Sequence, residues 1–143
     1  MLAIEKARES LRNGGAPFAA CIVKNNGVIA CAHGKVYKTL DPTAHAEITA
    51  IREACGKLKT ENLTGCTVYS TCEPCPMCFT ACHWARVSKV FYGADLKDSK
   101  KAGFDELDIP AAKIKKLGKS TVQVKGGVLK TECKRLFKEM RFT

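Results

Sequence analysis

The chain has 143 residues, of which 45% are hydrophobic, and carries a formal net charge of +10 at pH 7. This length and composition allow a buried core and exclude an intrinsically disordered chain, so we expect one domain over residues 1–143. No apolar run approaches the length of a membrane span, which argues against a membrane partner. The charged first residues do not resemble a signal peptide, and we expect a cytoplasmic protein.

The expected elements begin with an amphipathic helix over residues 2–13 and a strand over residues 18–23. Asn25-Asn26-Gly27 is a hairpin turn signal, and residues 28–32 return as the partner strand. A helix is expected over residues 41–56, capped by Asp41 or Thr43 and ended by Gly56.

The second half continues the alternation of strands and helices. A strand over residues 67–71 leads into a helix that starts at Pro74 and runs to about Arg86. The remaining segments are a strand at 89–93, a polar stretch with at most a short helix at 94–119, a strand at 121–124 and a helix at 129–140. This order predicts a three-layer α/β/α domain with a mixed central sheet and a site at the carboxyl edge of that sheet.

Nine cysteines without a secretion signal predict reduced thiols and metal binding rather than a disulfide framework. Five of them fall in apolar patterns or at element ends. We interpret these as small core residues: Cys21, Cys31, Cys55, Cys66 and Cys133.

Three side chains have the types and spacing of zinc ligands. His45 opens one expected helix, and Cys75 and Cys78 share one face at the start of another, where the helix dipole favours thiolates. One imidazole and two thiolates leave the fourth position of a tetrahedral Zn²⁺ open for water, as in catalytic zinc sites. Glu47 lies close enough in sequence to His45 to exchange protons with that water.

An iron–sulfur cluster is the competing interpretation of the same stretch. Cys72, Cys75, Cys78 and Cys82 have the spacing of a bacterial cluster-binding run. However, His83 stands where a proline usually follows, and the cluster would leave His45 and Glu47 unexplained. A non-catalytic zinc or iron–sulfur module therefore stays as an alternative to an enzyme.

The pattern H-x-E followed by P-C-x-x-C is the signature of zinc-dependent nucleobase deaminases. The chain resembles the cytidine-deaminase superfamily over almost its whole length, and within it the bacterial guanine deaminases. The blocks that carry the resemblance are DPTAHAEITAIR at 41–52, CEPCPMC at 72–78, WAR at 84–86 and AGFD at 102–105.

The resemblance implies a role for each matching residue. His45, Cys75 and Cys78 would bind one Zn²⁺, and Glu47 would be the general acid and base. Substrate contacts would come from seven positions: Phe18, Trp84, the backbone at Ala46 and Glu73, Asp105, Glu106 and, through a C-terminal segment that crosses to the partner subunit of a homodimer, Phe142.

The implied reaction is hydrolytic deamination of a free nucleobase with release of ammonia. Guanine, which would be converted to xanthine, is the first expected substrate. Gly34 stands where the family generally has an asparagine, and Glu106 replaces an aspartate, so guanosine, cytosine or cytidine stay as alternative substrates. The +10 charge also permits deamination of adenosine in tRNA. Because aromatic residues are few in the lysine-rich second half, we expect a small-molecule partner rather than nucleic acid.

Overall fold

The computed structural model describes residues 1–140. Its twelve helices and strands are, in chain order, α1 Leu2–Arg12, β1 Ala19–Lys24, β2 Gly27–His33, α2 Val36–Thr39, α3 Ala46–Leu58, β3 Thr67–Cys72, α4 Pro76–Trp84, β4 Lys89–Ala94, α5 Leu96–Lys101, α6 Ala111–Gly118, β5 Gln123–Lys125 and α7 Lys130–Glu139.

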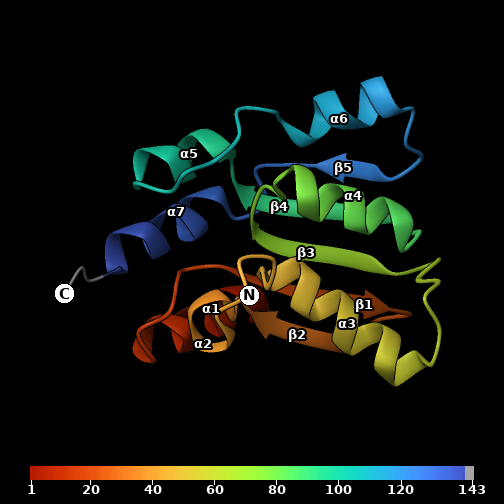
Figure 1. Cartoon of the computed structure of the whole chain (residues 1–143), viewed down its shortest axis with the longest axis horizontal. Helices are drawn as coiled ribbons and strands as arrows, with labels where there is room; N and C mark the ends of the chain where they lie inside the picture. Colours follow the sequence, from red (N-terminus) through yellow and green to blue (C-terminus); the bar gives the residue numbers. More distant parts are fainter. Residues whose placement is uncertain (141–143) are drawn as a thin grey trace.

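The central sheet is mixed, in the order β2-β1-β3-β4-β5, as Figure 1 shows from bottom to top. β1 pairs antiparallel with both β2 and β3, whereas β3, β4 and β5 run parallel. The ends of β2, β3 and β4 therefore lie at the same edge as the start of β1. This edge collects residues from four separate parts of the chain.

Helices cover both faces of the sheet, which confirms the expected three-layer α/β/α architecture. One core cluster joins α3, α4 and α6 to the sheet through residues such as Ala50, Phe79 and Ala111. A second cluster joins α1 and α7 to the other face through Ile4 and Leu136. In the part of the chain that the structure describes, no helix is both long and apolar enough to cross a membrane.

The first hairpin follows its sequence signal. Asn25 and Asn26 both have positive φ, 50° and 64°, as a two-residue type I′ turn requires. Cys21 and Cys31 lie directly opposite each other in this hairpin and form a disulfide. The prediction that these two cysteines are reduced is therefore wrong in this structure, because pairing in register brings their side chains together on one face.

Both helices that carry the expected ligands start later than predicted. Asp41 accepts a hydrogen bond from the backbone amide of Thr43 at 2.9 Å and forms a turn, so α3 begins only after His45. The second helix begins at Pro76 rather than Pro74, because a residue before proline is held in extended conformation and Cys75 occupies that position. The polar stretch 94–119 contains two helices, α5 and α6, instead of one short helix.

Candidate zinc and substrate site

His45 and Cys75 are the residues that immediately precede α3 and α4. Both have extended backbones, with φ and ψ of −62° and 162° at His45 and of −64° and 169° at Cys75. Cys78 follows in the first turn of α4. Two helix N-termini therefore point at one place, and their dipoles favour negative charge on the two sulfur atoms.

The three side chains converge as a metal site requires. His45 Nδ1 lies 3.6 Å from Cys75 Sγ and 3.6 Å from Cys78 Sγ, and all three donor atoms lie within 4.8 Å of one another. Tetrahedral zinc with usual Zn–S and Zn–N bonds separates nitrogen and sulfur by about 3.6 Å. The imidazole–thiolate donor set and its spacing thus fit Zn²⁺.

Cys72 and Cys82 do not join this group in the described residues. The Cys72 thiol instead faces the carbonyl oxygen of Asp95 at 3.8 Å. His83 also lies apart, with its Nδ1 2.7 Å from the hydroxyl of Ser120. The arrangement therefore gives no support to the four-cysteine cluster.

The sulfur atoms are electrostatically coupled. A hydrogen bond from Cys78 lowers the pKa of Cys75 to about 4 and raises the pKa of Cys78. The same Cys75 sulfur, through its hydrogen bond, raises the pKa of His45. A thiolate is the form of cysteine that binds a metal, so Cys75 is ready to do so at neutral pH.

Glu47 lies in the first turn of α3 and is 7% exposed. Its Oε1 accepts a hydrogen bond of 2.9 Å from the hydroxyl of Ser70 in β3. Burial raises the pKa of Glu47, and the nearby Cys75 raises it further, whereas the Ser70 hydrogen bond lowers it. A buried carboxyl group with a raised pKa is suited to receiving and returning a proton.

A cavity of about 220 Å³ opens beside these groups at the predicted edge of the sheet. It is lined by most of the residues expected to contact substrate, namely Phe18, Ala46, Glu73, Asp105 and Glu106, and by Gly34. The Glu106 carboxylate accepts a hydrogen bond of 2.9 Å from Ser99, and burial raises its pKa. Phe142 lies outside the described residues.

Trp84 is the expected pocket residue that the structure places elsewhere. It is 76% exposed and lines a separate surface hollow together with His83 and Arg86. Six residues of α-helix after Cys78 turn a side chain about 240° around the axis and move it about 9 Å along it. The prediction that Trp84 lies on the same face of α4 as Cys78 and lines the substrate pocket is therefore wrong.

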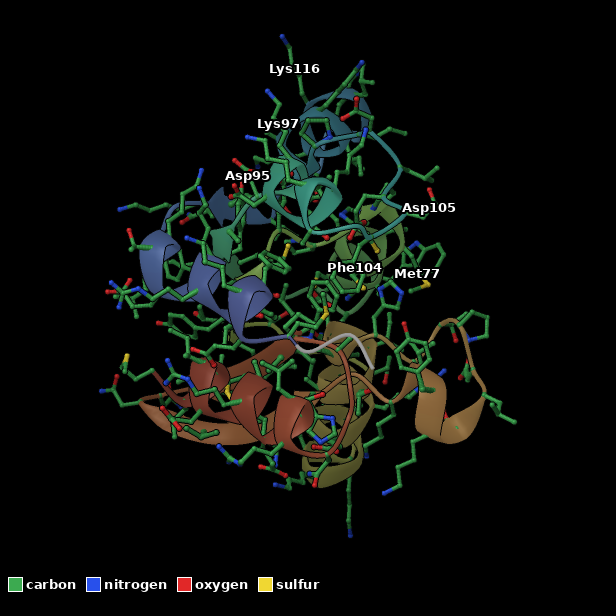
Figure 2. All side chains as sticks on the ribbon, turned by 90° about the vertical axis from the view of Figure 1, so that its left-hand side faces the viewer. Met77, Asp95, Lys97, Phe104, Asp105 and Lys116 are labelled. Atoms are coloured by element: carbon green, nitrogen blue, oxygen red, sulfur yellow. A yellow bond between two sulfur atoms is a disulfide. The ribbon has the colours of Figure 1, made fainter. Side chains whose placement is uncertain are left out.

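The cavity wall also contains several residues that were not expected from the sequence. Phe104 packs edge-on against Phe18, with ring centroids 4.7 Å apart, and Figure 2 shows it directed toward the middle of the molecule. Its place inside the AGFD block was the available signal. Val36 and Tyr37 of α2 also line the cavity, and so does Pro42 in the turn after α2. A helix of four residues, such as α2, leaves no periodic pattern in the sequence.

The comparisons with known proteins agree with this geometry. Residues 1–94 match the family described as the cytidine and deoxycytidylate deaminase zinc-binding region. The chain is 47% identical over 116 residues to guanine deaminase of Bacillus subtilis, covering 76% of this chain and 74% of that protein. It is 42% identical over 113 residues to the tRNA-specific adenosine deaminase of Aquifex aeolicus, with the same two coverages.

A solved structure of guanine deaminase from Nitrosomonas europaea superposes with a TM-score of 0.87 at 30% identity, covering 96% of this chain and 79% of that one. The matched family and the His45–Cys75–Cys78 group together show one zinc ion per chain. The chain belongs to the cytidine and deoxycytidylate deaminase zinc-binding family and is a zinc-dependent hydrolytic deaminase.

Proposed function

We propose that this deaminase acts on a free nucleobase, with guanine as the first substrate, and converts guanine and water to xanthine and ammonia. The observation that carries the proposal is the cavity of about 220 Å³ beside Glu47 and the zinc ligands. Pockets for drug-sized ligands begin at about 300 Å³, so this cavity suits a smaller molecule such as a single base.

The cavity wall offers groups that match a purine. Phe18 and Phe104 present aromatic rings for stacking or edge contacts. The carboxylate of Glu106 accepts a hydrogen bond from a ring N–H. Ala46 lies in the first turn of α3, where backbone N–H groups have no intrahelical acceptor, and can donate to the base.

Glu47 carries the proton transfers in this proposal. A zinc ion held by His45, Cys75 and Cys78 would lower the pKa of a bound water from about 15.7 to about 7 and so would supply the nucleophile. The Glu47 carboxylate takes one proton from the attacking water and gives it to a ring nitrogen. It then takes the remaining proton from the hydroxyl group added to the ring carbon and gives it to the amine, which leaves as ammonia while the carbon–oxygen bond becomes a carbonyl. The Ser70 hydroxyl donates a hydrogen bond to Oε1 of Glu47, so Oε2 is the oxygen that we expect to accept and donate the transferred protons.

The test is a screen for ammonia release from guanine, guanosine, cytosine, cytidine and adenine by the zinc-loaded protein. We expect guanine to give the highest kcat/KM. The variant Glu47→Gln should retain zinc and lose about 10²- to 10⁴-fold in rate, the usual contribution of a general acid and base. If cytosine or cytidine is turned over and guanine is not, the purine assignment is wrong.

Deamination of adenosine in tRNA is the second candidate. It is favoured by the 42% identity to the Aquifex aeolicus enzyme and by the net charge of +10. The screen therefore includes tRNA at two salt concentrations, because binding through phosphates weakens steeply as salt rises. Inosine formed in tRNA, without turnover of guanine, would favour this candidate over our proposal.

The proposal also includes a single domain over residues 1–143, a cytoplasmic location and a homodimer. The dimer is supported by the family resemblance and by the exposed Trp84 on α4. Sedimentation equilibrium of the zinc-loaded protein checks it, and a strictly monomeric active species would contradict it.

A further inference from the structure

We propose that the side chain of Glu73 is a positioning residue, which holds the substrate-facing loop after α5 against the zinc-binding loop. The proposal rests on the proposed function for its effect on substrate affinity. Glu73 lies between Cys72 and the ligand Cys75, yet it does not belong to the metal group.

The Glu73 carboxylate is buried, with the residue 6% exposed, and both of its oxygens accept backbone hydrogen bonds. Oε1 accepts from the amide of Leu96 at 3.3 Å, and Oε2 accepts from the amide of Ala111 at 2.8 Å. Leu96 opens α5 and Ala111 opens α6. One carboxylate therefore binds both ends of the segment 96–111.

This segment carries a wall of the cavity. Between the two bound amides lie α5 and a loop. Three residues of this loop, Phe104, Asp105 and Glu106, line the cavity. Figure 2 shows Phe104 and Asp105 on this loop, with Phe104 toward the middle of the molecule and Asp105 farther out. Fixing both ends of a loop restricts the positions that its middle can take.

The start of α6 depends on Glu73 for a cap. The preceding residue, Pro110, has no side-chain hydrogen bond to the helix. Ala111 is fully buried, so its amide has no access to water and needs a protein acceptor. A carboxylate is also favoured at a helix N-terminus by the helix dipole.

The backbone of Glu73 completes the link to the metal group. Its amide donates to the carbonyl of Ala94 at 2.7 Å at the end of β4. The backbone of Glu73 is therefore hydrogen-bonded to the sheet, and its side chain is hydrogen-bonded to both ends of segment 96–111. Glu73 is also only two residues before the zinc ligand Cys75 in the chain. A shift of this carboxylate moves the cavity wall relative to the zinc ligands.

The variant Glu73→Gln keeps the size of the side chain but replaces one acceptor oxygen by an NH₂ group that faces a backbone N–H. Losing one such buried hydrogen bond corresponds to about a tenfold change in an equilibrium. We expect amide hydrogen exchange in peptides from residues 96–111 to accelerate about tenfold or more. KM for guanine should rise about tenfold, while kcat changes less than threefold and zinc stays at one per chain.

Glu9→Gln is the matched control, because Glu9 is a partly exposed carboxylate on α1 that pairs with Lys6. It should leave exchange in residues 96–111, KM and zinc content at wild-type values. Unchanged exchange and KM in Glu73→Gln would overturn the proposal. Equal acceleration in the β1–β2 hairpin, or loss of zinc, would also overturn it, since Glu73 would then support the fold or the metal loop in general.

The two proposals fail separately. If the wild-type protein does not deaminate guanine, the proposed function is wrong. The exchange measurement still decides whether Glu73 holds segment 96–111, because it needs no substrate. The KM comparison is then made with the substrate that the ammonia-release screen identifies, and the same tenfold rise is expected.

Discussion

At the scale of single residues, Gly34 and Glu106 both line the cavity, and these are the two positions where the resemblance implies other residues, asparagine and aspartate. Gly34 lines the cavity, and a Cβ atom built on it would lie 3.7 Å from the carbonyl oxygen of Ala44 and 3.7 Å from the amide of Ala46. These are ordinary van der Waals contacts, so a Cβ atom fits at this position without backbone movement. Glycine therefore leaves space at this part of the cavity wall that a residue with a Cβ atom would occupy.

Glu106→Gln and Gly34→Asn test these positions. The Gln variant replaces a carboxylate that can accept from a ring N–H, and kcat/KM for the true base should fall about tenfold or more. Gly34→Asn should narrow the range of bases accepted, because it adds a side chain with donors and acceptors at the cavity wall. Steady-state kinetics on guanine, guanosine and cytosine measure both effects. An unchanged profile in Glu106→Gln would contradict a role in recognition.

At the scale of elements, α5 is fixed to α7 by charged groups. Asp98 accepts a hydrogen bond from the amide of Asp95 at 3.1 Å and completes a capping box at the start of α5. The same carboxylate lies 3.7 Å from Lys130 Nζ and 3.3 Å from Lys134 Nζ on α7. Its side chain is only 8% exposed, which limits screening by solvent.

Asp98→Ala should lower the free energy of unfolding by about 1–2 kcal/mol, since it removes a cap and two ion pairs. Asp108→Ala is the comparison, because Asp108 pairs with Lys100 on the surface with its side chain 74% exposed. The ion pair between Asp108 and Lys100 should contribute less than about 0.5 kcal/mol to the free energy of unfolding. Urea denaturation of both variants measures the difference. Equal effects would mean that the α5–α7 contact does not depend on Asp98.

At the scale of the whole molecule, zinc joins segments that are far apart in sequence. His45 precedes α3 and Cys75 precedes α4, and these helices cover neighbouring parts of one sheet face in Figure 1. A metal that binds only the folded chain stabilises it, by about 2.7 kcal/mol when free zinc is 100 times its dissociation constant.

Cys75→Ala should therefore lose zinc and unfold at a lower temperature, and added zinc should no longer raise its Tm. Cys72→Ala should keep one zinc per chain, because the Cys72 thiol faces Asp95 rather than the metal group. Metal analysis measures the zinc content of both variants, and calorimetry with and without a chelator measures how far zinc raises their Tm. Full zinc in Cys75→Ala together with loss in Cys72→Ala would show that the ligand assignment is wrong.

Most of the strands, the longer helices and the types of side chain at the site could be predicted from the sequence, whereas α2 and the second helix of the stretch 94–119 could not. Apolar periodicity, the Asn25-Asn26-Gly27 turn and the spacing of His45, Cys75 and Cys78 are local properties, so they could be read without coordinates. The start of α4 also follows from a local rule, because Cys75 precedes Pro76 and is held in extended conformation, so the helix begins at Pro76 rather than at Pro74.

Which residues come into contact depends on the packing of whole elements. The Cys21–Cys31 pairing depends on strand register, and the exposure of Trp84 depends on how α4 lies on the sheet. The Glu73 carboxylate reaches Leu96 and Ala111 because β3 and β4 end at one edge. Contacts between residues distant in sequence follow from packing of whole elements, and no short pattern around either residue encodes them.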